Sequence, residues 1–251
     1  MELIYAICFL ILGLLLGSFY NVVGLRVPLK KSIVYPNSHC PRCEKELGPL
    51  ELIPVLSYIW IGGKCRNCKA PISMLYPFIE LLTGLLFMYA FLYFGWSNEL
   101  VVSLLLISLL SIIIVSDLRY MIIPDKILLV FLFCFLIYRI LSPLDPWWNP
   151  YAAAFGASLF LLLVAIISKG GMGGGDIKLF FVIGIALGFP NVLFTFFIAS
   201  ILGALVGVLG IVLGKVKKRQ AIPFGPFIAV GALISLLYGE QLIDWYIQSL
   251  W

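Results

Sequence analysis

Two aspartates stand at positions where a membrane protein rarely places a charge. Asp117 follows the apolar run Val101–Val115, and Asp176 ends a glycine-rich segment just before another apolar run. A carboxylate at the edge of the hydrocarbon region is costly, so each one is a functional candidate. Two carboxyl groups held roughly 3 Å apart cannot both ionise, so one acts as a base on water and the other as an acid. Such a pair can hydrolyse peptide bonds without a metal.

Asp117 opens the motif that runs to Asp125. It is expected at the C-terminal end of a helix, where the helix macrodipole disfavours an anion, and this position suits a carboxyl that shares a proton. Pro124 interrupts the chain, because proline cannot continue a helix. Asp125 then precedes the next apolar run, where it is expected either to cap or support the helix or to take part directly in the chemistry.

Asp176 follows the glycines Gly173 and Gly175. Glycines allow the backbone to approach a substrate strand closely and to adopt positive φ angles. The alternative is a flexible turn that carries an N-cap aspartate. Five glycines around one methionine are more than a turn needs, which favours a functional site.

Four cysteines form two C-x-x-C pairs in a polar segment, and this spacing is typical of a structural zinc site with four thiolate ligands. The segment contains little apolar material, so a bound metal ion would supply the missing folding energy. Disulfides would require an oxidising compartment. The expected ligands are Cys40, Cys43, Cys65 and Cys68.

Three further polar residues lie in or beside apolar runs. Glu80 is about one turn inside the second run, where either a functional role or pairing with Lys or Arg is plausible. Asn21 and Arg26 end the first run and are candidates for a functional role. Alternatively, hydrogen bonds between helices and extension of the arginine side chain toward the membrane interface would explain them.

The composition indicates an all-α polytopic membrane protein. Of the 251 residues, 63% are hydrophobic and only 12% are charged, too few to cover a soluble domain. A span of the hydrocarbon core needs about 20 apolar residues. We expect about eight transmembrane helices, at residues 3–24, 76–94, 100–116, 127–141, 151–168, 178–189, 192–214 and 222–238, of which the sixth is short.

The basic residues predict the orientation in the membrane. An outside amino terminus places 16 of the 17 Lys and Arg residues on the cytoplasmic side and leaves only Arg139 near the other side. Asp117 and Asp176 then fall on the same cytoplasmic face. The net charge of +5 is too small to indicate nucleic-acid binding.

The chain is expected to have three parts. A first transmembrane helix covers residues 1–24, a cytoplasmic insert with the zinc site covers residues 25–75, and a transmembrane bundle that carries the aspartates covers residues 76–251.

Seven motifs, in order along the chain, resemble those of the bacterial type IV prepilin leader peptidases, which are intramembrane aspartic proteases of the GxGD type. The motifs cover Gly17 to Pro28, the two cysteine pairs His39 to Cys43 and Cys65 to Cys68, Ile53 to Tyr58, Tyr76 to Thr83, Asp117 to Asp125, Gly171 to Leu179, and Pro223 to Phe227. Any one of these motifs would be weak evidence, whereas seven in sequence are specific.

The resemblance implies that Asp117 and Asp176 are the catalytic pair and that Lys178, in the second aspartate motif, supports it. It implies a prepilin or prepseudopilin substrate, cleaved at the cytoplasmic face of the bacterial inner membrane. It also implies N-methylation of the new amino terminus with S-adenosylmethionine, in which the insert and the Gly17–Arg26 region take part.

Two alternatives remain at this point. One is a peptidase of the same kind without the methyltransferase activity. The other, from a different class, is a membrane transporter with an intramembrane carboxylate site. Against the transporter, both aspartates are expected at one membrane face rather than at the midplane.

Overall fold

The computed structural model describes residues 1–168, 172–215, 217, 220 and 222–250. These residues form nine α-helices and one short 3-10 helix, and no strand occurs among them. The expected all-α fold is therefore confirmed. The chain divides into two compact units, Met1–Val115 and Ser116–Trp251, which we call the amino-terminal unit and the carboxy-terminal unit.

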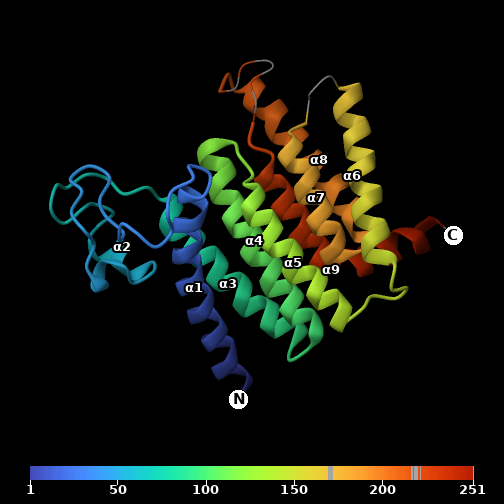
Figure 1. Cartoon of the computed structure of the whole chain (residues 1–251), viewed down its shortest axis with the longest axis horizontal. Coiled ribbons are helices and arrows are strands. Elements are labelled where there is room, and N and C mark those ends of the chain that lie inside the picture. Colours follow the sequence, from blue (N-terminus) through green and yellow to red (C-terminus); the bar gives the residue numbers. More distant parts are fainter. Residues whose placement is uncertain (169–171, 216, 218–219, 221, 251) are drawn as a thin grey trace. The chain divides into compact units, whose positions relative to one another are not determined.

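The amino-terminal unit consists of long helices and an irregular insert that extends to one side of α1 (Figure 1). Its elements are α1 (Glu2–Arg26), η1 (Pro49–Glu51), α2 (Leu56–Trp60), α3 (Leu75–Phe94) and most of α4 (Asn98–Tyr120). The four cysteines lie in the insert between α1 and α3. The first helix extends two residues beyond the expected end at 24.

Glycines bring α1 and α3 into close contact. A Cβ atom at Gly13 would lie 2.7 Å from the carbonyl oxygen of Thr83, and one at Gly17 would lie 2.9 Å from Cα of Glu80. Neither position has room for a larger residue, which is the packing that small residues four apart provide in membrane helices. A hydrogen bond joins α1 to α4 within the same unit, because Tyr20 Oη donates to Ser108 Oγ at 2.6 Å.

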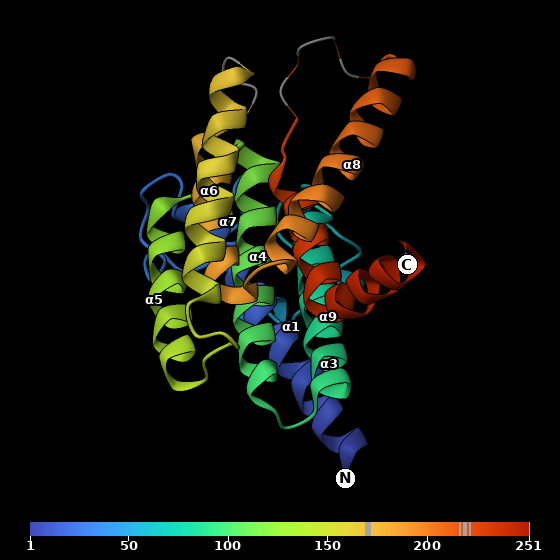
Figure 2. The ribbon, with the colours of Figure 1, turned by 90° about the vertical axis from the view of Figure 1, so that its right-hand side faces the viewer.

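The carboxy-terminal unit contains the end of α4 and five further helices (Figure 2). These helices are α5 (Asp125–Leu141), α6 (Asn149–Ile167), α7 (Gly174–Leu187), α8 (Asn191–Val212) and α9 (Gly225–Leu250). The short helix α7 is central, since it contacts α5, α6, α8 and α9. A Cβ atom at Gly184 would lie 2.7 Å from Cα of Ala154, so α6 and α7 pack backbone to backbone.

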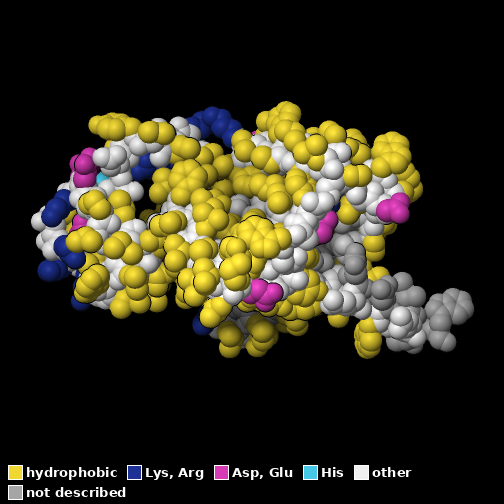
Figure 3. Space-filling model, turned by 90° about the horizontal axis from the view of Figure 1, so that it is seen from below, with side chains coloured by type: hydrophobic (Ala, Val, Ile, Leu, Met, Phe, Trp, Pro, Cys, Tyr) yellow, Lys and Arg dark blue, Asp and Glu magenta, His cyan; other side chains and the backbone are white. Residues whose placement is uncertain are grey.

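Five described helices, α1, α3, α4, α6 and α8, are long and apolar enough to cross a membrane. Hydrophobic side chains also cover much of the surface in Figure 3. The chain is therefore a multi-pass membrane protein. The expected count of eight spans is not confirmed, because α5 has 17 residues and α7 has 14.

A buried arginine joins α5 to α7. Arg139 is 4% exposed, and its guanidinium donates a hydrogen bond to the carbonyl oxygen of Ala186, near the C-terminal end of α7. A cation is favourable there because the last carbonyls of a helix carry partial negative charge.

Candidate active site and metal centre

Asp117 lies in the last turn of α4 and is 6% exposed. Its Oδ2 atom accepts a hydrogen bond of 2.7 Å from the backbone N–H of Gly225, the first residue of α9. A Cβ atom at position 225 would lie 2.8 Å from that same oxygen. A glycine at this position therefore allows the start of α9 to approach the carboxylate.

Asp176 lies in the first turn of α7. Its Oδ2 atom accepts a hydrogen bond of 3.2 Å from the N–H of Gly173, the residue that precedes the helix. Asp176 is thus the third residue of the helix, not its N-cap. The glycines have close neighbours within the chain, because a Cβ atom at Gly173 would lie 3.0 Å from Asp176 Oδ2 and one at Gly175 would lie 3.0 Å from Cβ of Ile123. Gly170 and Gly171 fall outside the described residues.

The two carboxylates interact electrostatically within the carboxy-terminal unit. Asp176 precedes the apolar stretch that begins at residue 178. Burial, and then the negative charge of Asp117, raise the pKa of Asp176 to about 6. A carboxyl group with this pKa holds a proton more readily than an ordinary aspartate does. The arrangement is therefore suited to one ionised and one protonated carboxyl group.

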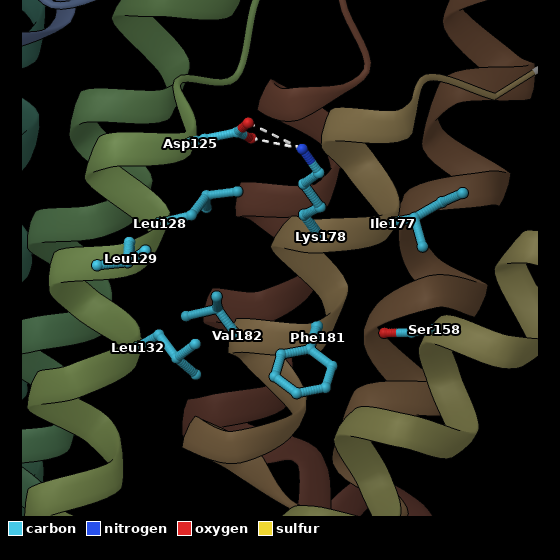
Figure 4. Close-up of a pocket in the computed structure, with 9 residues that line it drawn as sticks. All are labelled: Asp125, Leu128, Leu129, Leu132, Ser158, Ile177, Lys178, Phe181 and Val182. Carbon is cyan, nitrogen blue, oxygen red and sulfur yellow. Dashed lines mark hydrogen bonds and ion pairs between the residues drawn. The ribbon is translucent and has the colours of Figure 1, made fainter.

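Asp125 and Lys178 form an ion pair between α5 and α7 (Figure 4). Lys178 Nζ lies 2.8 Å from one carboxylate oxygen of Asp125 and 2.9 Å from the other. Asp125 makes no side-chain capping hydrogen bond, because the N-cap position of α5 is Pro124 and Asp125 is the first helical residue. The capping interpretation was wrong, since the carboxylate contacts a lysine 53 residues away.

This ion pair borders an apolar cavity of about 440 Å³ between α5, α6 and α7. Besides the two charged residues, the cavity is lined by Leu128, Leu129, Leu132, Ser158, Ile177, Phe181 and Val182. Figure 4 shows Asp125 and Lys178 pointing toward each other at one end of this lining.

The four cysteines of the insert form a compact cluster. Their Sγ atoms all lie within 4.8 Å of one another, with 3.7 Å between Cys40 and Cys68 and 3.9 Å between Cys43 and Cys65. Tetrahedral zinc with Zn–S bonds of about 2.3 Å needs sulfur atoms about 3.8 Å apart. The cluster could therefore bind a metal ion, and its geometry is compatible with zinc.

Two similar turns build this cluster. Cys40 N–H donates to Lys45 O at 3.0 Å, and Cys65 N–H donates to Ala70 O at 2.9 Å, so the same loop is closed twice. The N–H of Lys45 and the side chain of Asn67 lower the pKa of the Cys43 thiol to about 6. Burial and the neighbouring thiols raise the pKa of the Cys68 thiol to about 11, so metal binding, which requires thiolates, must lower it.

The polar residues expected near the first helix lie in the amino-terminal unit. Asn21 is 1% exposed and donates from Nδ2 to Tyr76 O at 3.1 Å. Glu80 is 8% exposed, and its Oε2 accepts a 2.8 Å hydrogen bond from Val55 N–H. The described partners of Glu80 are thus the backbone of the insert and the hydroxyl of Ser18, where Lys or Arg was one expectation.

Arg26 holds the start of the insert and borders a second cavity. Its guanidinium donates to Ser32 O at 3.1 Å and to Asn37 O at 3.4 Å. The cavity has a volume of about 350 Å³, and its lining includes Phe19, Arg26 and Val34.

Comparison with known proteins identifies the family. Residues 11–94 match the bacterial peptidase A24 N-terminal domain, and residues 104–208 match the type IV leader peptidase family. A prepilin leader peptidase/N-methyltransferase of Bacillus subtilis (strain 168) is 46% identical over 95% of this chain and 96% of its own length. The chain belongs to the type IV leader peptidase family. The resemblance in the seven sequence motifs is therefore confirmed.

Other members of the leader peptidase family are similar over the same extent. A prepilin leader peptidase/N-methyltransferase of Pseudomonas aeruginosa is 35% identical over 98% of this chain and 95% of its own length. One of Legionella pneumophila is 32% identical over 95% of this chain and 94% of its own length. No solved structure gives a significant match.

The sequence did not predict two backbone N–H groups that contact candidate site residues. The N–H of Gly225, which contacts Asp117 directly, was not among the expected site groups. The contact of Val55 with Glu80 was also missed. The glycine beside Pro226 was the available signal in the first case, because proline favours the first turn of a helix and so predicts a helix N-terminus there. The second contact has no comparable sequence signal.

Proposed function

We propose that this enzyme removes the leader peptide from type IV prepilins or prepseudopilins and methylates the new amino terminus. Similarity over nearly the full length to enzymes named for both activities supports the proposal. The observation that carries the peptidase activity is the coupled pair of Asp117 and Asp176 within one compact unit. The transporter alternative has no support from these relatives.

In the proposed cleavage, Asp117 is the base and Asp176 is the acid. Asp117 accepts the N–H of Gly225 at the start of α9, where the helix macrodipole favours an anion. Asp176, with its raised pKa, holds the proton. Asp117 takes a proton from water, the water oxygen attacks the scissile carbonyl carbon, and Asp176 donates its proton to the carbonyl oxygen. Asp117 then gives the proton it took from water to the amide nitrogen, the C–N bond breaks and the amine leaves, and a hydroxyl of the intermediate returns a proton to Asp176 as the carboxylic acid product forms.

Zinc and S-adenosylmethionine belong to the second activity of this proposal. Cys40, Cys43, Cys65 and Cys68 would hold zinc as a structural ion, because a closed set of four thiolates leaves no position for a substrate. S-adenosylmethionine supplies the methyl group when bound. The cavity beside Arg26 is within the usual size range of ligand sites, and the guanidinium suits the carboxylate of this donor.

We place the enzyme in the bacterial inner membrane with its active site facing the cytoplasm. The asymmetry of the basic residues supports this orientation, because it assigns 16 of 17 Lys and Arg to one side. The substrate and the lipid bilayer are the expected partners. The three-part division at residues 24 and 75 belongs to the same proposal, with the aspartates in the bundle from residue 76.

The test is incubation of the purified enzyme with a prepilin, followed by mass measurement of the products. Asp117→Asn and Asp176→Asn keep the side-chain volume, and each should reduce cleavage at least a hundredfold, roughly the contribution of a general acid or base. Asp145→Asn, at an exposed loop position, is the matched control and should cleave normally. Normal cleavage by either active-site variant would refute the pairing of the two aspartates. In the wild type, a cleaved but unmethylated product would refute the second activity alone.

A further inference from the structure

Two buried acceptor groups lie near each other where α1 packs against α3. Asn21 and Glu80 are 1% and 8% exposed, and both belong to the amino-terminal unit. The side chain of Asn21 contacts Tyr76, which lies one helical turn before Glu80 on α3. Gly17, one turn before Asn21 on α1, packs against Cα of Glu80. The two side chains are therefore held one turn apart along the same seam.

One acceptor of this pair has no partner. Asn21 Oδ1 is buried and makes no hydrogen bond within the part of the chain that the structure describes. An unsatisfied buried polar atom costs roughly 1–3 kcal/mol, so it points to a donor supplied from outside the chain.

The other acceptor is a carboxylate whose described partners are neutral. Glu80 accepts hydrogen bonds from the N–H of Val55 and from the hydroxyl of Ser18. Neutral donors do not balance a buried negative charge, and a buried charge is stable only when it is paired. A cation that also donates hydrogen bonds would pair with this carboxylate in its ionised form.

The backbone over Glu80 is strained. Val55 has φ 61° and ψ −51°, and Leu56 N–H bonds to Pro54 O across it, which forms the rarer and strained type of γ-turn. A β-branched residue with positive φ is an outlier. Strain of this kind marks functional sites, and here it directs the N–H of Val55 to the Glu80 carboxylate. The insert that carries the cysteines thereby forms one side of the site.

We infer that Asn21, Glu80 and the turn at Val55 form a binding site for a protonated primary amine. Such an amine supplies both the positive charge that Glu80 lacks and the N–H donor that Asn21 Oδ1 lacks. This inference rests on the proposed function, under which the amine is the α-amino group of the processed pilin. Transfer of one proton from the bound ammonium to the Glu80 carboxylate leaves the nitrogen lone pair free. A sulfonium methyl donor would supply the methyl group, with cleavage of its S–CH3 bond and departure of the sulfur as a neutral thioether.

The experiment measures the binding of a peptide amine, a readout that does not depend on cleavage or methylation. Two synthetic peptides carry the mature amino-terminal sequence of a type IV pilin, one with a free amine and one with an acetylated amine. Their Kd values are measured against the purified full-length enzyme in nanodiscs at about pH 6.5, below the usual α-amino pKa of about 7.7–8.0. We expect the wild type to bind the free-amine peptide at least about tenfold more tightly, the effect of a hydrogen bond to a charged group.

The variants assign that preference to individual side chains. Glu80→Gln keeps an acceptor for Val55 N–H and removes the charge, so the preference should fall to about onefold. Asn21→Leu removes the unpaired acceptor and should reduce the preference by about 2- to 10-fold, even if Glu80→Gln does not fold. Glu51→Gln is the matched control, because it neutralises a carboxylate that pairs with Arg66 in the insert, and it should keep the full preference.

Equal binding of both peptides by the wild type, or an unchanged preference in the folded Glu80→Gln or Asn21→Leu variant, would overturn the amine site. The same wild-type preparation is assayed on a prepilin. Amine preference without cleavage or methylation would refute the proposed function and leave the site standing. Cleavage and methylation without amine preference would refute the site alone.

Discussion

The contact between Gly225 and Asp117 predicts that one added methyl group disables cleavage. In Gly225→Ala, the new Cβ atom would lie 2.8 Å from Asp117 Oδ2, 3.1 Å from its Cβ and 3.2 Å from its Cγ. Ordinary contacts of a Cβ atom begin at 3.4 Å, so the carboxylate has to move by about 0.6 Å. Movement of the backbone is restricted, because Asp117 is buried in the last turn of α4.

The size of the effect follows from what this movement disturbs. A hydrogen bond to a charged group is worth roughly 1.5–3 kcal/mol, and a misplacement of about 1 Å in an active site can cost a hundredfold in rate. We therefore expect kcat/KM for cleavage to fall by roughly 10- to 100-fold. The fold should survive, because overpacking of one methyl group costs about 1–3 kcal/mol.

The assay is the initial rate of prepilin cleavage by purified enzyme, with thermal unfolding measured on the same samples. Gly207→Ala, in α8, is the matched control, since its new Cβ atom would lie 3.7 Å from Ile222 and meet only an ordinary contact. Wild-type cleavage by a folded Gly225→Ala variant would refute the reasoning. So would an equal loss in Gly207→Ala, because the effect would then come from the membrane helices and not from Asp117.

Three further predictions follow from the two sites. Burial and the charge of Asp117 raise the pKa of Asp176 to about 6, so the singly protonated pair is lost as the pH rises above that value. The kcat/KM for cleavage should therefore decline above about pH 6, approaching tenfold per pH unit. A flat profile up to pH 8 would contradict this assignment of the acid. Cys43→Ser or Cys65→Ser should remove bound zinc, measured by atomic emission. Each should lower thermal stability or methylation more than cleavage. Complete loss of cleavage in both variants would contradict a structural role of the zinc site that is separate from the peptidase. Lys178→Met should slow cleavage only about 2- to 5-fold, because the side chains of Lys178 and Asp125 are 59% and 69% exposed. The double variant Lys178→Asp with Asp125→Lys should recover part of the cleavage rate. A double variant that cleaves no faster than either single variant would show that the charges do more than pair.

Local patterns predicted the parts of the site that depend on neighbouring residues. The two C-x-x-C pairs predicted the clustered sulfur atoms, because each pair closes within one turn. The glycine-rich segment predicted a helix start beside Asp176. The contacts that close each cysteine turn and that begin α7 span only a few residues, which a linear pattern can reveal.

Contacts between distant segments could not be read from the sequence. Gly225 lies 108 residues from Asp117, and Lys178 lies 53 residues from Asp125. Asp125 fitted a helix cap because it follows a proline, but its charge found a lysine that only the packing of α5 against α7 brings near. The predicted number of transmembrane spans is not confirmed for a similar reason. A helix of 14 residues is about 21 Å long and is shorter than the hydrocarbon core of about 30 Å, so α7 depends on the helices around it.

The division of residues between the two compact units bears on how one chain could carry two activities. Asp117 and Asp176 both lie in Ser116–Trp251, whereas the four cysteines of the insert, Asn21 and Glu80 all lie in Met1–Val115. The two family matches, 11–94 and 104–208, separate in nearly the same place. Each unit also has its own interior, since α1 packs on α3 in one and α7 on α6 in the other. A substitution that disturbs the packing of one unit should therefore affect one activity directly. Helix α4 contributes Ser108 to the first unit and Asp117 to the second, so a single change in this helix should affect both activities.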